Sequence, residues 1–526
     1  MKNWQISSNQ IWIIALIIIF LVSLLIRFWG LDRFYYLVFD EDHYVPHAYG
    51  YLTNQENFTQ DIHPPLGRYL IAVSIWLDAH NPFTNHDKVL PEVLFTTPES
   101  FREAFRQESL INPFSYRWLT AFCGAWIPVV IASLAKTLTN RQSMGLLAGV
   151  LATVEGYFVI ESRFALINIF LVLFGLIGVY GFLLGVQKQG VWQNWWLSMG
   201  GIFLGCSMAV KWSGLWFLFG ISGVIIFVRL LLWIKALQLT NNNINFSRKH
   251  WRSWKNWFSY HLDNLTAGKG YLHQSNPVFN FRHLGLGKIF VYLLIIPAVT
   301  YTLAWIPHLP LNQGMSFIDR QKWILESHLI SAPDGHPNCS RWHQWLFATA
   351  PVGYYLRHYE VNTPQENITI IQGYGNPVVW WLSTIVVGMM TIFALYKIMA
   401  IVLRKKQSEL PLGDHEWTIF YVVINYWANL LPWLFVKRCI FQYHYLPAYG
   451  FAILSLAWVL DLLITNRHRV AKVTGSLIVV GALLAFQYWL PIFIGLPMSA
   501  QDYEQKLWLP SWHEGWVFTR DRLAPN

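Results

Sequence analysis

Long apolar segments recur along the whole chain and are separated by polar connections. Residues 11–29, 164–184 and 475–495 are three examples, each of roughly twenty residues with few charges. A helix rises 1.5 Å per residue, so a segment of this length crosses a hydrocarbon core roughly 30 Å thick. One such segment would also suit a signal peptide, but a series of them does not. The pattern predicts an all-α polytopic membrane protein.

The apolar segments predict about eleven crossings, which places the two termini on opposite sides of the membrane. Their centres lie near residues 18, 127, 152, 173, 203, 225, 295, 388, 424, 457 and 484. Lys and Arg are concentrated in alternate connections, for example Lys136 and Arg141 in one and the triplet 404–406 in another. By the positive-inside rule these connections and the N-terminus face the cytosol.

The chain is expected to form a single membrane domain, residues 1–526, with several long polar segments. In this topology 30–115, 307–376 and the tail 497–526 are extracytoplasmic, and 234–287 is a cytosolic loop. The extracytoplasmic segments hold Trp, His, Pro and charges that topology alone does not require. Function is therefore expected on that side of the membrane.

Composition supports a membrane protein and argues against a nucleic-acid partner. Hydrophobic residues make up 54% of the chain and charged residues only 13%. The formal net charge of +10 belongs to residues that flank apolar segments, and the 29 Trp and 25 Tyr are typical of interfacial anchoring. No two of the four Cys are close enough in sequence for a zinc site, but Cys339 and Cys439 are both extracytoplasmic and could pair.

Three adjacent acids follow the first predicted crossing. They are Asp40, Glu41 and Asp42, within the run FDEDHY. Acids this close raise one another's pKa, and burial among aromatic residues raises it further, so one of them could act as a general base. A solvated loop with a cation partner would explain the cluster equally well from composition alone.

A rigid helix start, DIHPPLGR, follows in the same connection. Pro64 and Pro65 fix the backbone and begin an amphipathic or re-entrant helix over 66–77, which is too short to span. They hold Asp61 and His63 at its N-terminal end, where the helix dipole favours anions. A helix start alone would explain the proline pair, but the acids nearby favour a functional site.

Cations lie at the predicted extracytoplasmic ends of several crossings. They are Arg27, Arg117, Arg163, Lys211, Lys437 and Arg438. Snorkelling towards the interface explains any one of them. Several on one face would instead bind an anionic head group such as a lipid phosphate. His444 follows the last of them, where interfacial packing would explain a lone histidine.

In this order the residues resemble the protein O-mannosyltransferases, polytopic enzymes of the GT-C glycosyltransferase class. The resemblance begins at Arg27 and continues through FDExH, which ends at His43, to DxHPPLG. Further matches are SR at Ser162, KWSGL at Lys211, GNP followed by WW, and HYLPA at His444. The FDE and HPPL elements together are specific to this family.

The resemblance implies transfer of mannose from a polyprenyl-phosphate-mannose lipid to Ser or Thr hydroxyls of proteins that cross or leave the membrane. The family's catalytic acidic pair carries over to Asp40 and Glu41, and its span-end arginine to Arg117. The remaining candidates for binding the substrate or the donor phosphate are Asp61, His63, Arg163, Lys211, Arg438 and His444. Those for positioning are Arg27, His43, Pro64 and Pro65.

The chain departs from the family's pattern at several points. Where relatives usually have a lysine after FDE it has His47, and where they often have an aspartate in the fourth span it has Asn168. The segment 307–376 is too short for the large β-trefoil insert of the eukaryotic members. We therefore expect a bacterial-type member in the plasma membrane, with its active site and C-terminus extracytoplasmic.

The expected reaction is a single displacement that inverts the anomeric carbon. Asp40 or Glu41 takes the proton of the acceptor hydroxyl, and cations, with Arg117, Lys211 and Arg438 as candidates, stabilise the departing lipid phosphate. The donor is already activated, which fits the lack of a Gly-rich phosphate loop in the sequence. Oxygen ligands from Asp40 and Asp61 would also suit Mg²⁺ or Mn²⁺, so the sequence leaves a metal open.

Two other functions stay open at this stage. Another lipid-linked glycosyltransferase of the same architecture would add its sugar to a lipid or a cell-wall glycan. A transporter of an anionic lipid or solute would carry charges near the bilayer midplane, where only Glu155 comes close. The favoured reading predicts three partners: the lipid donor, an acceptor polypeptide at the secretion translocon, and membrane lipids.

Overall fold

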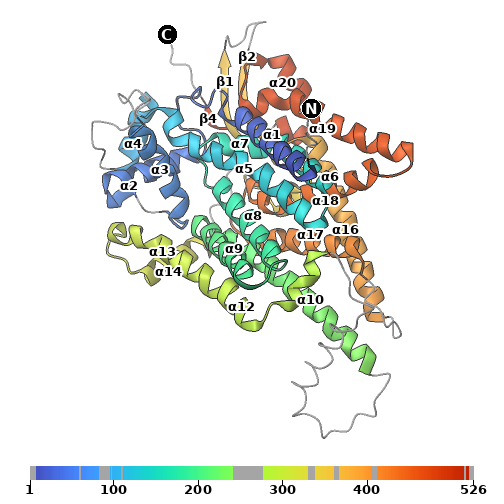
Figure 1. Ribbon diagram of the computed structural model, residues 1–526. Helices are drawn as coiled ribbons and strands as arrows, with labels where there is room; N and C mark the ends of the chain where they lie inside the picture. Colours follow the sequence, from blue (N-terminus) through green and yellow to red (C-terminus); the bar gives the residue numbers. More distant parts are fainter. Residues whose placement is uncertain are drawn as a thin grey trace, which may run out of the picture.

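The structure, a computed structural model, describes residues 7–58, 61–81, 95, 97–107, 111–240, 276–329, 338–359, 367–403, 412–513 and 517–520. Helices form most of this part of the chain and pack side by side in a bundle (Figure 1). Nine of the described helical segments are long and apolar enough to cross a membrane. They are Ser8–Phe28 (α1), Pro113–Thr139 (α5), Asn168–Gly185 (α8), Trp212–Ile234, Leu286–Leu311, Pro377–Leu403 (α16), Asp414–Phe435, Gln442–Ile464 and Arg469–Ile494 (α19).

All eleven predicted crossings are helical, but the count of eleven is not confirmed. Gln142–Thr153 (α6) and Gly156–Arg163 (α7) meet at an angle of 57°, which makes them one broken span or a re-entrant loop and the tenth candidate. The segment centred on residue 203 forms Gly190–Val210 (α9), which is not among the helices apolar enough to span. Helix α9 packs along α8 and buries one face there, so that face does not need to be apolar enough to contact lipid.

Four further helices of the bundle carry or border the residues discussed below. They are Leu215–Thr240 (α10), Ile296–Trp305 (α13), Asp414–Leu430 (α17) and Leu446–Ile464 (α18). Most residues of α8 and α18 are buried, whereas α1, α16 and Leu286–Leu311 expose most of their apolar side chains. Exposed apolar helices of this length are stable in lipid, as expected of an integral multi-pass membrane protein.

The segment after α1 forms three short helices outside the bundle: Glu41–Thr53 (α2), Leu66–Ala79 (α3) and Pro98–Gln107 (α4). The helix predicted over 66–77 is confirmed as α3, and Pro65 occupies its N-cap position. The fixed φ of proline suits the start of a helix, which is why the proline pair marks this boundary. Phe317–Leu329 (α14) adds a fourth outer helix from a distant part of the chain.

A small β-sheet, which the sequence did not predict, covers the same end of the bundle. Its order is β3-β2-β1-β4, with Val352–Tyr359 (β1) antiparallel to Asn367–Gly373 (β2). Met498–Ser499 (β3) and Val517–Arg520 (β4) pair at the two edges. The sheet therefore joins the segment 307–376 to the tail that begins at 497.

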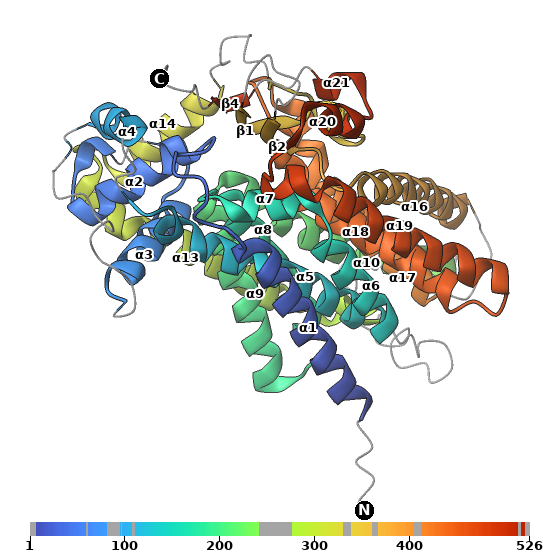
Figure 2. The ribbon, with the colours of Figure 1, turned by 90° about the horizontal axis from the view of Figure 1, so that it is seen from above.

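The two ends of the bundle differ (Figure 2). The sheet lies at one end together with Ala500–Lys506 (α20) and Pro510–His513 (α21), and α1 begins at the opposite end. Outer helices α2, α4 and α14 lie on the side of the sheet. The predicted cytosolic loop 234–287 falls mostly outside the described residues, which resume with the 3-10 helix Pro277–His283.

A disulfide ties two of the outer segments together. Cys339, after α14, is bonded to Cys439, and their Cα atoms are 5.1 Å apart. Ser340 and Ile440 form an isolated antiparallel bridge beside the bond. The predicted pairing is thus present, and it fixes the short segment that carries Lys437 and Arg438.

Candidate active site

Asp40 lies where the outer segment after α1 turns into α2. It occupies the N-cap position of that helix and is half-buried. The preceding Phe39 has φ 56°, a left-handed conformation that bulky residues rarely adopt. The Phe39 ring packs against Tyr354 and Tyr443, with ring centroids 4.7 and 6.0 Å away. Such strain persists only where packing holds it and is common at active sites, so these rings fix the backbone at Asp40.

The surroundings of Asp40 suit a general base. Burial raises the pKa of Asp40, and the positive charges of His43 and Lys211 oppose that rise. In the described part of the chain no residue donates a hydrogen bond to its carboxylate. A carboxylate with a raised pKa and unengaged oxygens can accept a proton from a substrate.

Glu41, the next residue, is fully engaged by the protein. Its Oε1 accepts hydrogen bonds from Arg117 Nε at 2.8 Å and from the Ala165 amide at 2.8 Å. Its Oε2 accepts from Arg117 Nη2 at 2.7 Å and from the Val38 amide at 2.8 Å. Glu41 is completely buried, so the adjacent acids have different surroundings: Glu41 braces the fold, whereas Asp40 is half-buried and interacts electrostatically with Lys211.

Two of the expected phosphate-binding arginines are used elsewhere. Besides Glu41, Arg117 donates to the carbonyls of Leu31 and Phe34 at 3.2 and 2.7 Å. Arg163 donates to carbonyls at the end of α1, including those of Arg27 at 3.0 Å and Trp29 at 2.8 Å. These contacts correct the expectation that Arg117 and Arg163 bind the donor phosphate, because both guanidinium groups hold the segment before Asp40.

Asp61 and His63 lie together at the start of α3. The Asp61 carboxylate is 3.5 Å from Arg68 Nε and accepts a hydrogen bond from the His63 amide at 3.3 Å. Burial acts to raise the pKa of Asp61, but the positive charge of Arg68 holds it below its ordinary value. Burial and the charge of Lys211 lower the pKa of His63, so this histidine is neutral at pH 7.

Lys211 belongs to a buried hydrogen-bond chain. Its Nζ donates to Asn168 Oδ1 at 3.1 Å, and Asn168 Nδ2 donates to Glu161 Oε2 at 3.0 Å. Tyr354 of β1 donates its hydroxyl to the other oxygen of Glu161. The Lys211 ammonium also lies 5.1 Å from the centroid of the Tyr443 ring. Lys211, at the end of α9, is thus connected through hydrogen bonds to α8, to α7 and to the sheet.

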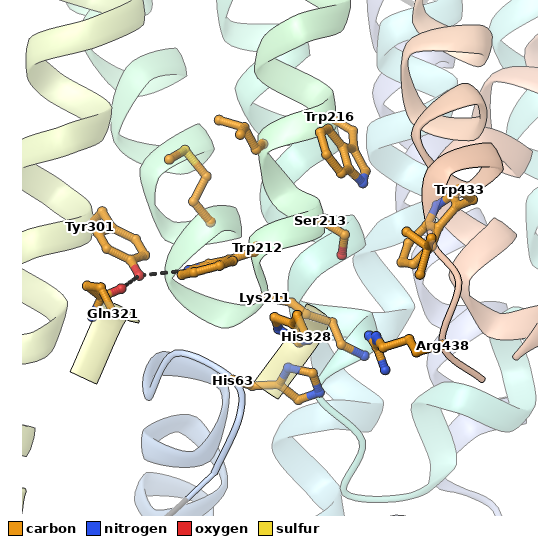
Figure 3. Close-up of a pocket in the computed structure, with 13 residues that line it drawn as sticks. His63, Lys211, Trp212, Ser213, Trp216, Tyr301, Gln321, His328, Trp433 and Arg438 are labelled. Carbon is orange, nitrogen blue, oxygen red and sulfur yellow. Dashed lines mark hydrogen bonds between the residues drawn. The ribbon is translucent and has the colours of Figure 1, made fainter. Parts of the chain in front are cut away.

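The side chains of His63, Lys211, His328 and Arg438 gather on one side of a cavity of about 430 Å³, called the central cavity below (Figure 3). Indole rings of Trp212, Trp216 and Trp433 also line it. Burial lowers the pKa of His328 to about 4, which leaves Lys211 and Arg438 as the cations of this wall at neutral pH. Two cations beside aromatic walls suit an anionic group attached to an apolar body.

Two further cavities adjoin the central one. An apolar groove of about 870 Å³ is lined by Trp216, Phe219, Leu329, Phe435 and their neighbours. A polar cavity of about 740 Å³ lies along the disulfide and is lined by Arg341, His343 and Lys437, among others. Arg438 lines all three cavities, so it lies at their junction.

Three other predicted site residues lie outside the central cavity's wall. Arg27 is buried in α1 and donates to Ser23 Oγ at 2.6 Å. His43 is exposed, with its Nδ1 3.2 Å from Arg102 Nη2. His444 is buried against Trp433, with ring centroids 4.3 Å apart, and therefore lies behind the cavity wall. Pro64 and Pro65 are buried at the start of α3, as a positioning role requires.

Comparison with known proteins places this geometry in a family. A family model described as dolichyl-phosphate-mannose-protein mannosyltransferase matches residues 17–311. A second, described as the C-terminal four-span region of protein O-mannosyltransferase, matches 314–512. The chain belongs to the protein O-mannosyltransferase family. The expected resemblance is thereby confirmed over most of its length, with the GT-C fold that it implied.

Several curated relatives of this protein O-mannosyltransferase family member come from bacteria. The chain is 23% identical to a polyprenol-phosphate-mannose–protein mannosyltransferase of Mycolicibacterium smegmatis, covering 90% of this chain and 87% of that one. It is 24% identical to the enzyme of the same name from Corynebacterium glutamicum, covering 97% and 94%. A solved complex of Saccharomyces cerevisiae Pmt1 and Pmt2 bound to the sugar donor shares the fold, with a TM-score of 0.69, 14% identity and coverage of 98% and 94%.

The two acids predicted as metal ligands in this family member, Asp40 and Asp61, are close enough for their charges to interact. Among the described residues no three His, Cys, Asp or Glu side chains are grouped so that they could hold a metal ion. Of the two predicted ligands, Asp61 is paired with Arg68, whose Nε lies 3.5 Å from its Oδ2. That Asp40 and Asp61 hold a Mg²⁺ or Mn²⁺ ion together with a substrate phosphate stays a prediction, and no step of the proposed reaction uses such an ion.

Sequence reasoning missed several residues of the site. Glu161 and Tyr354 lie in the Lys211 network, and His328 in the cavity wall, yet none lies in a recognised motif. Glu161 directly precedes the SR match, so an acid inside an otherwise apolar run was the available signal. Tyr354 and His328 come from the segment 307–376, where residue pattern alone does not predict contacts with the bundle.

Proposed function

We propose that the protein transfers mannose from a polyprenyl-phosphate-mannose lipid to Ser or Thr hydroxyls of polypeptides. The observation that carries the proposal is the half-buried carboxylate of Asp40 beside a cavity whose wall holds Lys211 and Arg438. The family membership and the names of the relatives supply the sugar and the acceptor class. The apolar groove that opens from the cavity suits the polyprenyl chain.

The proposed step is a single displacement at the anomeric carbon. Asp40 takes the proton of the acceptor hydroxyl while the hydroxyl oxygen forms a bond to the anomeric carbon. The bond from that carbon to the phosphate oxygen breaks, and polyprenyl phosphate leaves with the bonding electron pair. Lys211 and Arg438 stabilise the charge that grows on the phosphate. Attack opposite the leaving group inverts the anomeric configuration.

Transfer of radiolabelled mannose from polyprenyl-phosphate mannose to a Ser/Thr-rich peptide tests the proposal directly. Purified wild-type protein should label the peptide, and the same assay with EDTA measures whether a divalent cation takes part. If the protein binds the donor but labels only lipid or glycan fractions, the acceptor is not a protein. If it moves the donor across vesicles without transfer, it is a transporter.

We further propose that the site faces away from the cytosol in a bacterial plasma membrane, with the N-terminus cytosolic. The disulfide between Cys339 and Cys439 lies beside the site, and such bonds persist in oxidising compartments. We also propose that acceptors reach the enzyme as extended chains at the secretion translocon. Cysteine labelling of single substitutions in intact cells and spheroplasts tests this orientation.

The rate of transfer should depend on pH with a bell shape. Activity rises as Asp40 loses its proton, at a pH above the ordinary carboxylate value because burial raises the pKa of Asp40. It falls as Lys211 is deprotonated, because burial lowers the pKa of Lys211 to about 8. The charge of Arg438 lowers this pKa further, whereas those of Asp40, Glu161 and Asp61 raise it. Steady-state kinetics between pH 5 and 10 measure both limbs.

Lys211→Arg provides the control for the alkaline limb. Arginine keeps its proton throughout this range, so the variant should lose the fall near pH 8 even if its maximal rate is lower. An unchanged alkaline limb in that variant would assign the titration to another group.

Removal of the disulfide should weaken donor binding. The bond anchors the segment that carries Arg438, so the double variant Cys339→Ser/Cys439→Ser should raise the KM for the donor several-fold, roughly three- to tenfold. The matched control is Cys123→Ser/Cys206→Ser, which removes two thiols that form no disulfide. Equal KM values in both double variants would show that the bond does not position Arg438.

A further inference from the structure

Glu161 is a buried acid at the site to which the proposed displacement gives no part. It lies in α7, is completely buried, and accepts hydrogen bonds on both carboxylate oxygens. We propose that Glu161 is a positioning residue that aims the Lys211 ammonium at the donor phosphate through the amide of Asn168. This inference rests on the proposed function and assigns a residue to its phosphate site.

The direction of the hydrogen bonds supports this role. When Glu161 is ionised its carboxylate can only accept, so it attracts the NH₂ end of the Asn168 amide, which donates to Oε2. The opposite, carbonyl end of that amide must then face Lys211, which is the arrangement observed at 3.0 and 3.1 Å. Asn168 is the first residue of α8, and Lys211 is the C-cap of α9. Glu161 thus sets the position of a lysine from another helix without touching it.

The same carboxylate also reaches the neighbourhood of Asp40. Tyr354 donates its hydroxyl to Glu161, and its ring packs on Phe39, whose backbone leads directly into Asp40. A second contact, at 3.4 Å, joins the Tyr354 hydroxyl to that of Tyr157 in α7. Glu161 therefore braces both the cation of the phosphate wall and the aromatic support of the proposed base.

Replacement of Glu161 by glutamine should reverse the donor and acceptor directions of the hydrogen bonds between residues 161, 168 and 211. In Glu161→Gln the amide oxygen can still accept from Tyr354, but the new NH₂ group then faces Asn168. Asn168 must turn its carbonyl towards that group, and its own NH₂ then faces the Lys211 ammonium, donor against donor. We expect the affinity for polyprenyl phosphate to fall about 10- to 100-fold, since a charge-assisted contact is misdirected.

A second substitution should restore the site. In Glu161→Gln/Asn168→Asp the new carboxylate at position 168 accepts from both the new amide and Lys211, so the number of charges and hydrogen bonds equals that of the wild type. The double variant should recover donor affinity to within about threefold of wild type. A purely structural role for Glu161 does not predict such a rescue.

Glu155 provides the matched control. It is also completely buried and lies at the junction of α6 and α7, where it accepts from Tyr449 at 2.7 Å and caps α7. Among the described residues it makes no hydrogen bond to Asn168 or Lys211, so Glu155→Gln should lower thermal stability without changing donor affinity. Asn168→Leu is the second test, because it removes the link but keeps Glu161, and it should weaken donor binding as Glu161→Gln does.

The measurements are the affinity for polyprenyl phosphate without sugar, and the KM for donor and for acceptor peptide in the transfer assay. The inference predicts a loss confined to donor affinity and donor KM, with rescue by the double variant. It is overturned if both Glu161→Gln and Asn168→Leu bind polyprenyl phosphate as wild type does, or if the double variant is no better than the single one. Failure of the wild type to transfer mannose would overturn the proposed function instead, because phosphate binding is read separately.

Discussion

Asp40→Asn should lower the rate of mannosyl transfer by roughly 10²- to 10⁴-fold, the range expected for loss of a general base. The amide keeps the shape of the side chain but cannot take the proton of the acceptor hydroxyl. Donor affinity should stay within a few-fold of wild type, because the phosphate wall is formed by Lys211 and Arg438. Single-turnover transfer and equilibrium binding of polyprenyl phosphate, measured on the same preparation, separate the two effects.

Asp42→Asn is the matched control for this substitution. Asp42 belongs to the same acidic cluster and lies two residues after Asp40, in the first turn of α2, but it lies outside the proposed machinery. Its removal should change the rate less than about threefold. If Asp40→Asn retains more than a tenth of the wild-type rate, or if Asp42→Asn is equally impaired, the base is a different group.

Much of the fold was predictable because lipid imposes simple rules. Apolar segments of roughly twenty residues must be helical where they cross a bilayer, which is why every predicted crossing is a helix. The limits of the prediction are also physical. The bend between α6 and α7 depends on how Glu155 is satisfied by Tyr449 and Asn376, far along the chain. The apolar pattern of the sequence does not predict such hydrogen bonds between distant residues.

The site was predictable in its residues but not in their roles. Motifs brought Asp40, Glu41 and Lys211 to attention, and the structure places Asp40 and Lys211 around one site. The sequence could not tell the base from its neighbour, because the difference lies in Arg117, which is 76 residues from Glu41 in sequence. Residue type and spacing suggest chemistry, whereas burial and hydrogen-bond partners assign it.

The two acids therefore predict opposite kinds of defect, and Glu41→Gln provides the test. Glu41 and Arg117 form a completely buried ion pair with two hydrogen bonds, at 2.8 and 2.7 Å. Removal of one partner leaves a buried charge without compensation, which costs about 3–5 kcal/mol. Glu41→Gln should thus lower the thermal unfolding midpoint sharply, and Arg117→Met should do the same. Differential scanning fluorimetry in detergent measures both.

Activity and stability can be separated in these variants. At a temperature where Glu41→Gln is still folded, its transfer rate should exceed that of Asp40→Asn, because its base is intact. Glu41→Gln/Arg117→Met should be more stable than the sum of the single losses predicts, since no unpaired charge stays buried. A folded Glu41→Gln protein with wild-type stability and no transfer would reverse the assignment and make Glu41 the base. Asp40 would then have to be the residue that stabilises the fold. Its surroundings do not support that role, because its carboxylate accepts no hydrogen bond from the described residues.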